Sequence, residues 1–152
     1  HRFYGDVADV VFANAIRLGF EKGLRNQARL PSFERFRIGG ATTVRGYDEM
    51  SLGPLDEFGN HRGDVMFVFN TELRFPIYKL VGAAIFFDLG NVWDEPRTLN
   101  GLIKDIRVNQ PWSALGFGLR IDTVLGPARL DYGIPIDQNV DGKLHLALGH
   151  AF

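Results

Sequence analysis

The sequence predicts an all-β protein of a particular kind, an antiparallel transmembrane β-barrel. Six segments alternate bulky apolar residues with a second set of residues, which is the period-two pattern of β-strands. The second set mixes Gly and Ala with Asp, Glu, Arg, Asn and His, a mixture that the outward face of a soluble sandwich seldom carries. The connections alternate between long and tight. Apolar-outside, polar-inside strands with alternately long and short connections are typical of outer-membrane barrels.

The first three predicted strands show which residues share a face. They are Val7–Glu21, Asp64–Phe75 and Leu80–Trp93. A tight turn is expected at Pro76–Lys79, between the second and third of them. Because alternate side chains of a strand point to opposite faces, Glu72 falls on the polar face of the second strand. Asp88 falls on the polar face of the third. The sequence therefore places both carboxylates in the interior of the predicted barrel, on neighbouring strands.

The last three predicted strands complete the sheet. They are Trp112–Thr123, Ala128–Ile134 and Lys143–Phe152. Another tight turn is expected at Val124–Pro127. Trp93 and Trp112 fall near the long-loop ends of their strands, and Tyr78 falls at a tight turn. These are the two levels at which membrane proteins place aromatic belts.

Small and charged residues alternate on the polar faces of the fourth and fifth strands. Asp122 and Asp131 look like a carboxylate pair, but each lies close to an arginine, so charge pairing is the preferred interpretation over acid–base catalysis. Gly116 and Gly118 are expected to leave space inside the barrel for a loop.

Composition and motif content exclude several functions. The chain has 152 residues, a formal net charge of −1 and no cysteine, which argues against nucleic-acid binding, disulfides and thiolate metal sites. His145 and His150 are isolated, so we expect neither a metal nor another cofactor. No serine lies in a nucleophile elbow, and no glycine-rich phosphate loop follows a strand. We therefore expect no enzymatic activity.

Six strands do not close a barrel, and a sheet cannot leave an open edge in lipid. The chain begins at His1 and shows no signal peptide. We therefore expect residues 1–152 to be the C-terminal portion of a longer barrel domain, with earlier strands absent. The alternative is that several copies of the chain complete one another.

The long connection of residues 22–63 holds the most specific motif. Gly39 and Gly40 allow a tight turn or a positive φ, and the β-branched residues that follow stiffen the chain before Arg45. A fixed guanidinium suits a carboxylate partner, although a solvated loop arginine is the alternative. The motif residues are Gly39, Gly40, Val44, Arg45, Gly46 and Tyr47.

The segment Ile38–Tyr47 resembles the lid-loop motif of the BamA/TamA outer-membrane assembly superfamily, which includes surface antigens and two-partner secretion pores. Further segments resemble its later strand motifs in the same order. They are Thr71–Pro76, Phe86–Trp93, Gly116–Arg120 and Gly126–Tyr132.

This resemblance implies a barrel behind periplasmic POTRA domains, which this chain lacks, with residues 22–63 as the lid loop. In the family the loop folds into the lumen and its arginine meets acidic residues of the wall, here Arg45 with Glu72 and Asp88. The alternative is that the two carboxylates only line the lumen. The last strand would lie at the closing seam and resemble a β-signal. Its marked residues are Leu144, Leu146, Leu148, Gly149 and Phe152.

The function implied is that of an outer-membrane insertase or translocase, acting in the assembly or export of outer-membrane proteins. A two-partner secretion pore, the membrane anchor of a patatin-like lipase and a soluble β-sheet binding module are the alternatives. The expected partners are the lipid bilayer, client polypeptides and POTRA-linked assembly proteins. The expected location is the outer membrane of a Gram-negative bacterium or of an organelle of bacterial origin.

Overall fold

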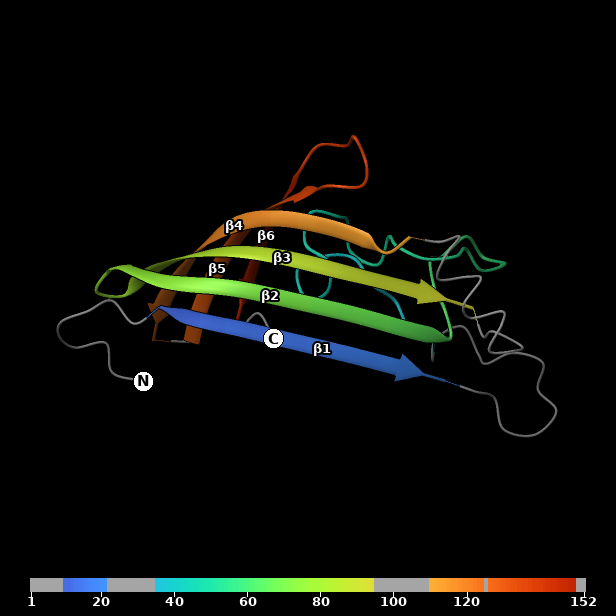
Figure 1. Ribbon diagram of the computed structural model, residues 1–152, viewed down its shortest axis with the longest axis horizontal. Coiled ribbons are helices and arrows are strands. Elements are labelled where there is room, and N and C mark those ends of the chain that lie inside the picture. Colours follow the sequence, from blue (N-terminus) through green and yellow to red (C-terminus); the bar gives the residue numbers. More distant parts are fainter. Residues whose placement is uncertain (1–9, 22–34, 95–109, 125, 150–152) are drawn as a thin grey trace.

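The computed structural model describes residues 10–21, 35–94, 110–124 and 126–149. These residues form one six-stranded antiparallel sheet in which each strand pairs with the next along the chain (Figure 1). The all-β prediction is therefore confirmed. None of the described residues forms a helix long and apolar enough to cross a membrane. The strands are β1 Val11–Phe20, β2 Val65–Tyr78, β3 Val81–Trp93, β4 Trp112–Thr123, β5 Gly126–Pro135 and β6 Lys143–Leu148.

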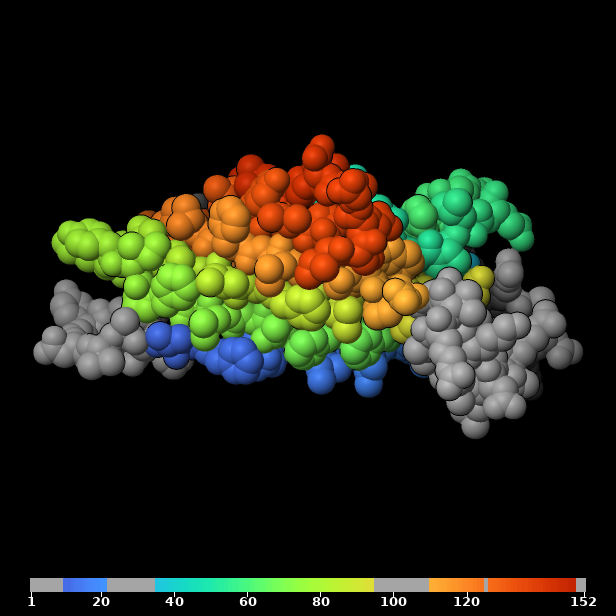
Figure 2. Space-filling model, turned by 45° about the horizontal axis from the view of Figure 1, so that its top comes forward, coloured from blue at the N-terminus to red at the C-terminus, as the bar shows by residue number. Residues whose placement is uncertain are grey.

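The sheet is strongly curved, so that β5 and β6 lie behind β3 and β4 in Figure 1. Its two faces differ as the alternation predicted. The side chains in view in Figure 2 form a continuous surface over the strands. The large exposed apolar residues include Phe12, Leu18, Ile85, Phe117, Ile134 and Leu146, whereas buried polar residues come from the opposite parity. On the strands these are Asn70, Glu72, Asp88, Arg129 and Asp131. Asn91, near the end of β3, is also buried but has the parity of the outward apolar residues.

Two predicted details are wrong. β2 continues through Pro76 to Tyr78, with a register irregularity against β3, so the turn is at Lys79 and Leu80. A proline near the end of a strand is tolerated where the ladder is irregular. Trp93 is only 7% exposed, so it presents no open ring to a membrane interface.

The described part of the lid loop, residues 35–63, is folded rather than extended. Backbone bridges join Phe36 to Gly63, Ile38 to Leu52, and Leu55 to His61. The loop then lies behind the sheet in Figure 1, against its concave face. Residues 22–34 of the predicted lid loop lie outside the described residues.

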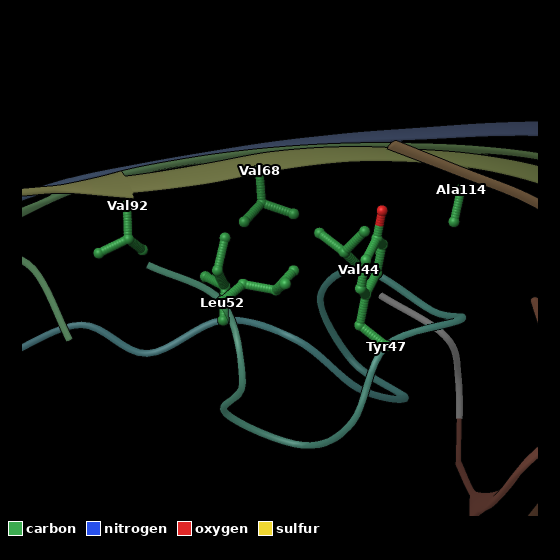
Figure 3. Close-up of a cluster of buried hydrophobic side chains, with 7 residues drawn as sticks. Val44, Tyr47, Leu52, Val68, Val92 and Ala114 are labelled. Atoms are coloured by element: carbon green, nitrogen blue, oxygen red, sulfur yellow. The ribbon is translucent and has the colours of Figure 1, made fainter. Parts of the chain in front are cut away.

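The buried apolar core lies between this loop and the sheet. From the loop come Ile38, Val44, Tyr47 and Leu52, and from the sheet come Val68, Val92 and Ala114. Figure 3 shows the loop side chains pointing toward the strands and the strand side chains pointing back. Full burial of one such side chain stabilises by roughly 1.5–3 kcal/mol. The loop is therefore held to the wall by apolar contacts as well as by polar ones.

Candidate functional site

The tip of the loop is built around two glycines with positive φ. Gly39 has a φ of 108° and Gly40 a φ of 96°, a region that residues with a side chain rarely adopt. The Gly40 amide donates to the Val44 carbonyl at 3.1 Å, and the Thr43 amide donates to the Gly40 carbonyl at 3.2 Å. This compact turn fixes the direction in which Arg45 leaves the loop.

Arg45 is buried against two carboxylates on neighbouring strands. Its Nε and Nη2 donate to the two oxygens of Asp88 at 2.7 and 2.8 Å. Its backbone amide also donates to Asp88, at 3.0 Å. Its Nη1 donates to Glu72 at 2.8 Å. Asp88 on β3 thus holds both the side chain and the main chain of the motif arginine, while Glu72 on β2 holds one corner of the guanidinium.

Two further residues complete the surroundings of Arg45. Asp131 on β5 accepts from Nη1 at 3.3 Å. The ring of Phe86 on β3 lies 3.5 Å from the guanidinium carbon, a cation–π arrangement. We call Glu72, Phe86, Asp88 and Asp131 the lid site. At the lid site the guanidinium of Arg45 lies over the apolar ring of Phe86 and contacts three carboxylates.

The charges of the lid site are balanced mainly by other arginines of the wall. Arg74 and Arg120 contact Glu72, and Arg120 and Arg129 contact Asp131. Burial alone would lower the pKa of Arg45, but the hydrogen bonds and charges of the lid-site carboxylates raise its pKa above the ordinary value. The motif arginine therefore keeps its charge in the buried position.

The three carboxylates depend on the loop to different degrees. Among the described residues, Asp88 forms its ion pair with Arg45 alone and otherwise accepts from the Asn70 amide at 2.7 Å. Glu72 and Asp131 are both also contacted by Arg120, which belongs to β4 and not to the loop. Removing one partner of a buried ion pair typically costs about 3–5 kcal/mol. If the loop undocks, Asp88 loses its ion-pair partner Arg45, so this cost opposes undocking.

Side chains of the wall also hold the backbone of the loop tip. The carbonyl of Ala41 accepts from Arg129 on β5 at 2.7 Å, and that of Thr43 accepts from Asn70 on β2 at 2.7 Å. The carbonyl between them, of Thr42, accepts from Arg17 on β1. Three consecutive carbonyls thus have donors on three different strands. The tip is positioned by its backbone as well as by the motif side chains.

The end of the motif is anchored to β4 and to the segment that follows β5. The Tyr47 hydroxyl donates its proton to the carboxylate of Asp137, and the Ser113 carbonyl lies 3.2 Å from the same oxygen. Burial and this hydrogen bond to Asp137 raise the pKa of Tyr47 above its ordinary value. Gly46 approaches β5 so closely that a Cβ on Gly133 would lie 2.5 Å from the Gly46 nitrogen. The backbone of the loop therefore rests directly on the backbone of the wall.

The predicted seam residues lie apart from the lid site. Leu144, Leu146 and Leu148 are exposed on β6, and the Gly149 amide donates to the Pro127 carbonyl at 2.7 Å. Gly149 has a φ of 101°. Phe152 and His150 lie outside the described residues. The structure thus gives β6 a regular apolar outer face up to Leu148.

Three residues of the site are not predicted by the motif or by the alternation. The sequence predicts Asp131 only as a partner of its neighbouring arginine, gives Phe86 no role beyond the segment Phe86–Trp93, and suggests His145 only as a metal ligand to be excluded. His145 in fact accepts a hydrogen bond from the Gly46 amide at 3.1 Å. The face parity of each strand was a signal for all three residues, but it could not show that they converge on one loop.

The predicted role of the two glycines on β4 is also corrected. A Cβ on Gly116 would meet the Phe86 ring at 2.2 Å, and one on Gly118 would meet the Asp131 carboxylate at 2.0 Å. The space that they leave is filled by wall side chains of the lid site, not by the loop itself. The described residues hold no group of three or more His, Asp or Glu side chains that could bind a metal ion.

Replacing Phe86 with Leu should loosen the docked loop without removing a charge. A cation–π contact contributes about 0.5–2 kcal/mol, so hydrogen exchange of the Arg45 amide should accelerate by roughly twofold to thirtyfold. Exchange mass spectrometry of the loop peptide in the intact protein measures this rate. Phe117 is 60% exposed on the opposite face of the sheet. An equal acceleration in a Phe117→Leu control would contradict a specific role for Phe86.

Comparison with known proteins places this arrangement in a family. A family model described as the Omp85 superfamily domain matches residues 2–152. The outer membrane protein assembly factor BamA of Nitratidesulfovibrio vulgaris is 32% identical over 123 residues, covering 78% of this chain and 15% of that protein. The chloroplastic outer envelope protein 80 of Arabidopsis thaliana is 36% identical over 118 residues, covering 76% and 15%. The chain thus spans only a small part of these relatives.

A solved structure shares the fold. The crystal structure of BamA from Haemophilus ducreyi lacking POTRA domains 1-3 superposes with a TM-score of 0.66 at 18% sequence identity. The match covers 90% of this chain and 30% of that one. The curved sheet described above therefore corresponds to part of a known outer-membrane barrel fold.

Proposed function

Because the chain belongs to the Omp85 superfamily, we propose that it is the C-terminal portion of an outer-membrane barrel that inserts or translocates other outer-membrane proteins. The protein is an outer-membrane protein of a bacterium or of an organelle of bacterial origin. The relatives named as assembly factors support assembly over the secretion-pore and lipase-anchor alternatives. The proposal assigns no covalent chemistry to any residue.

The observation that carries the proposal is the buried docking of Arg45 on the lid site. An arginine with three carboxylate contacts, a ring beneath it and donors on the adjacent carbonyls costs much to displace. We infer that the docked loop is the working state of the protein. The docked loop then stabilises the wall of the barrel from inside.

With the loop docked against the wall, the last strand is the part of the barrel that acts on clients. In the described part of the chain, β6 pairs only with β5 and presents its other edge without a partner. An open strand edge offers backbone donors and acceptors to an incoming client strand. The proposed partners are therefore client polypeptides, the lipid bilayer and the POTRA-linked proteins that deliver clients.

A cysteine pair tests the proposal. A Cβ on Gly90 would lie 2.7 Å from Cγ2 of Val44, so cysteines at these two positions should form a disulfide when the loop is docked. The chain has no other cysteine. In the intact protein we expect the oxidised Val44→Cys/Gly90→Cys variant to assemble client barrels as well as the reduced one does. An Arg45→Ala variant should assemble client barrels roughly tenfold less well or worse, because loss of a buried ion pair costs more than about 1.4 kcal/mol, which corresponds to a factor of ten.

Each arm of this test can overturn the proposal. No disulfide in a folded, heat-modifiable barrel would mean that the loop does not dock on the wall. Loss of assembly on oxidation, restored by reduction, would mean that the loop must leave the wall during work. Normal assembly by the Arg45→Ala variant would mean that the lid site is not needed for the proposed function. The Val44→Cys single variant controls for the substitution itself.

A further inference from the structure

The last strand is joined to the lid loop by a contact that no motif predicted. The imidazole Nε2 of His145, on β6, accepts the hydrogen bond of the Gly46 amide at 3.1 Å. Gly46 directly follows Arg45, so this bond joins the docked segment to the last strand. A second contact, from Lys143 Nζ to the Asp48 carboxylate at 3.1 Å, lies largely in solvent. Exposed pairs of this kind contribute little.

β6 has few other attachments. It is the shortest strand of the sheet, and it pairs with β5 over six positions, from Gly133 with Lys143 to Ala128 with Leu148. Its outward side chains Leu144, Leu146 and Leu148 are 65–76% exposed. The partly buried bond from Gly46 therefore adds a contact with the loop to the ladder that joins β6 to β5.

We propose that His145 is a positioning residue that ties the first half of the last strand to the docked loop. The tie lies three residues into β6, so Lys143–His145 is restrained from two sides. Among the described residues, Leu146–Leu148 is paired with β5 and has no hydrogen bond to the loop. Loop docking and strand pairing then stabilise each other, because coupling between two sites is reciprocal. The second half of β6 becomes the half that separates first from β5. This inference rests on the docking proposed above.

The tie depends on the protonation of His145. Only an unprotonated Nε2 can accept from the Gly46 amide, since both ring nitrogens of the imidazolium are donors. The charged groups that face the ring are Glu49 and Arg45 of the loop, and Asp131 and Arg129 of β5. Protonation of His145 therefore breaks the bond, whereas a Gln at this position could accept at every pH.

Hydrogen exchange in the intact protein, folded in detergent, tests the inference with three variants. His145→Leu should speed exchange of the Gly46 amide and of the amides in 143–145 by roughly two- to tenfold, the loss expected for one hydrogen bond. Amides 146–148 should change little. His145→Gln should restore protection. Lys143→Met, which removes only the exposed ion pair, should leave Gly46 protected.

A pH series adds a readout that a purely structural role would not move. After correction for intrinsic exchange, protection of the Gly46 amide should fall on acidification in the wild-type protein but not in His145→Gln. If the Arg45 amide, which is bonded to Asp88, is unprotected in the wild type, loop docking itself fails. If that amide is protected but His145→Leu leaves Gly46 and 143–145 unchanged, docking stands and the tie is wrong.

Discussion

Replacing Asp88 with Asn is expected to weaken loop docking more than the corresponding change at any other carboxylate of the lid site. Asp88 accepts the Nε, Nη2 and backbone N–H groups of Arg45, and among the described residues no second arginine forms an ion pair with it. Breaking this buried pair should cost about 3–5 kcal/mol. That corresponds to a fall of roughly two to four powers of ten in the docking equilibrium.

The Val44→Cys/Gly90→Cys pair measures this change. Its redox equilibrium with glutathione reports how often the two cysteines meet, and hence how stably the loop is docked. Glu72→Gln is the matched comparison, because Glu72 makes one contact with Arg45 and keeps Arg74 and Arg120. Its effect should be near 1.5 kcal/mol, and that of Asp131→Asn should be smaller still. An equal effect at Asp88 and Glu72 would contradict the dominant role of Asp88.

Replacing Gly133 with Ala is expected to displace the loop without touching any charge. The added Cβ would lie 2.5 Å from the nitrogen of Gly46 and 2.7 Å from the carbonyl carbon of Arg45. Both are backbone atoms, so no flexible side chain can move aside. Overpacking of this kind costs about 1–3 kcal/mol, and sometimes more, which lowers the disulfide equilibrium by roughly five- to 150-fold.

A second glycine substitution controls for the effect of alanine on the sheet. Gly82 lies on β3, and a Cβ there would meet Phe75 only at 3.2 Å, away from the loop. Gly82→Ala should therefore leave the disulfide equilibrium unchanged, while both variants keep the heat-modifiable mobility of a folded barrel. If Gly133→Ala docks its loop as well as Gly82→Ala does, the close backbone approach at Gly46 is not what positions the loop.

Much of the sheet could be predicted because a strand shows its two faces in its own sequence. Period-two alternation gave all six strands, and it gave the inversion of apolar outside and polar inside. The same parity placed Glu72 and Asp88 on the interior face, where the structure has both in contact with Arg45. Strand ends were less certain, as at Pro76, because an irregular ladder tolerates a residue that a regular one does not.

The partners from later strands could not be predicted in the same way. Asp131 reaches Arg45 across 86 residues, and His145 reaches Gly46 across 99. Those contacts depend on how far each strand is shifted against its neighbour and on how strongly the sheet curves around the loop. Neither the shift between strands nor the curvature of the sheet can be inferred from the alternation within one strand.

The sequence by itself thus determined which face each side chain takes and which residue types meet inside the barrel. The tertiary structure decided which individual residues contact one another. Parity is a local property of a strand, whereas the close approach of Gly46 to Gly133 and the bond from Gly46 to His145 need the curvature of the whole sheet.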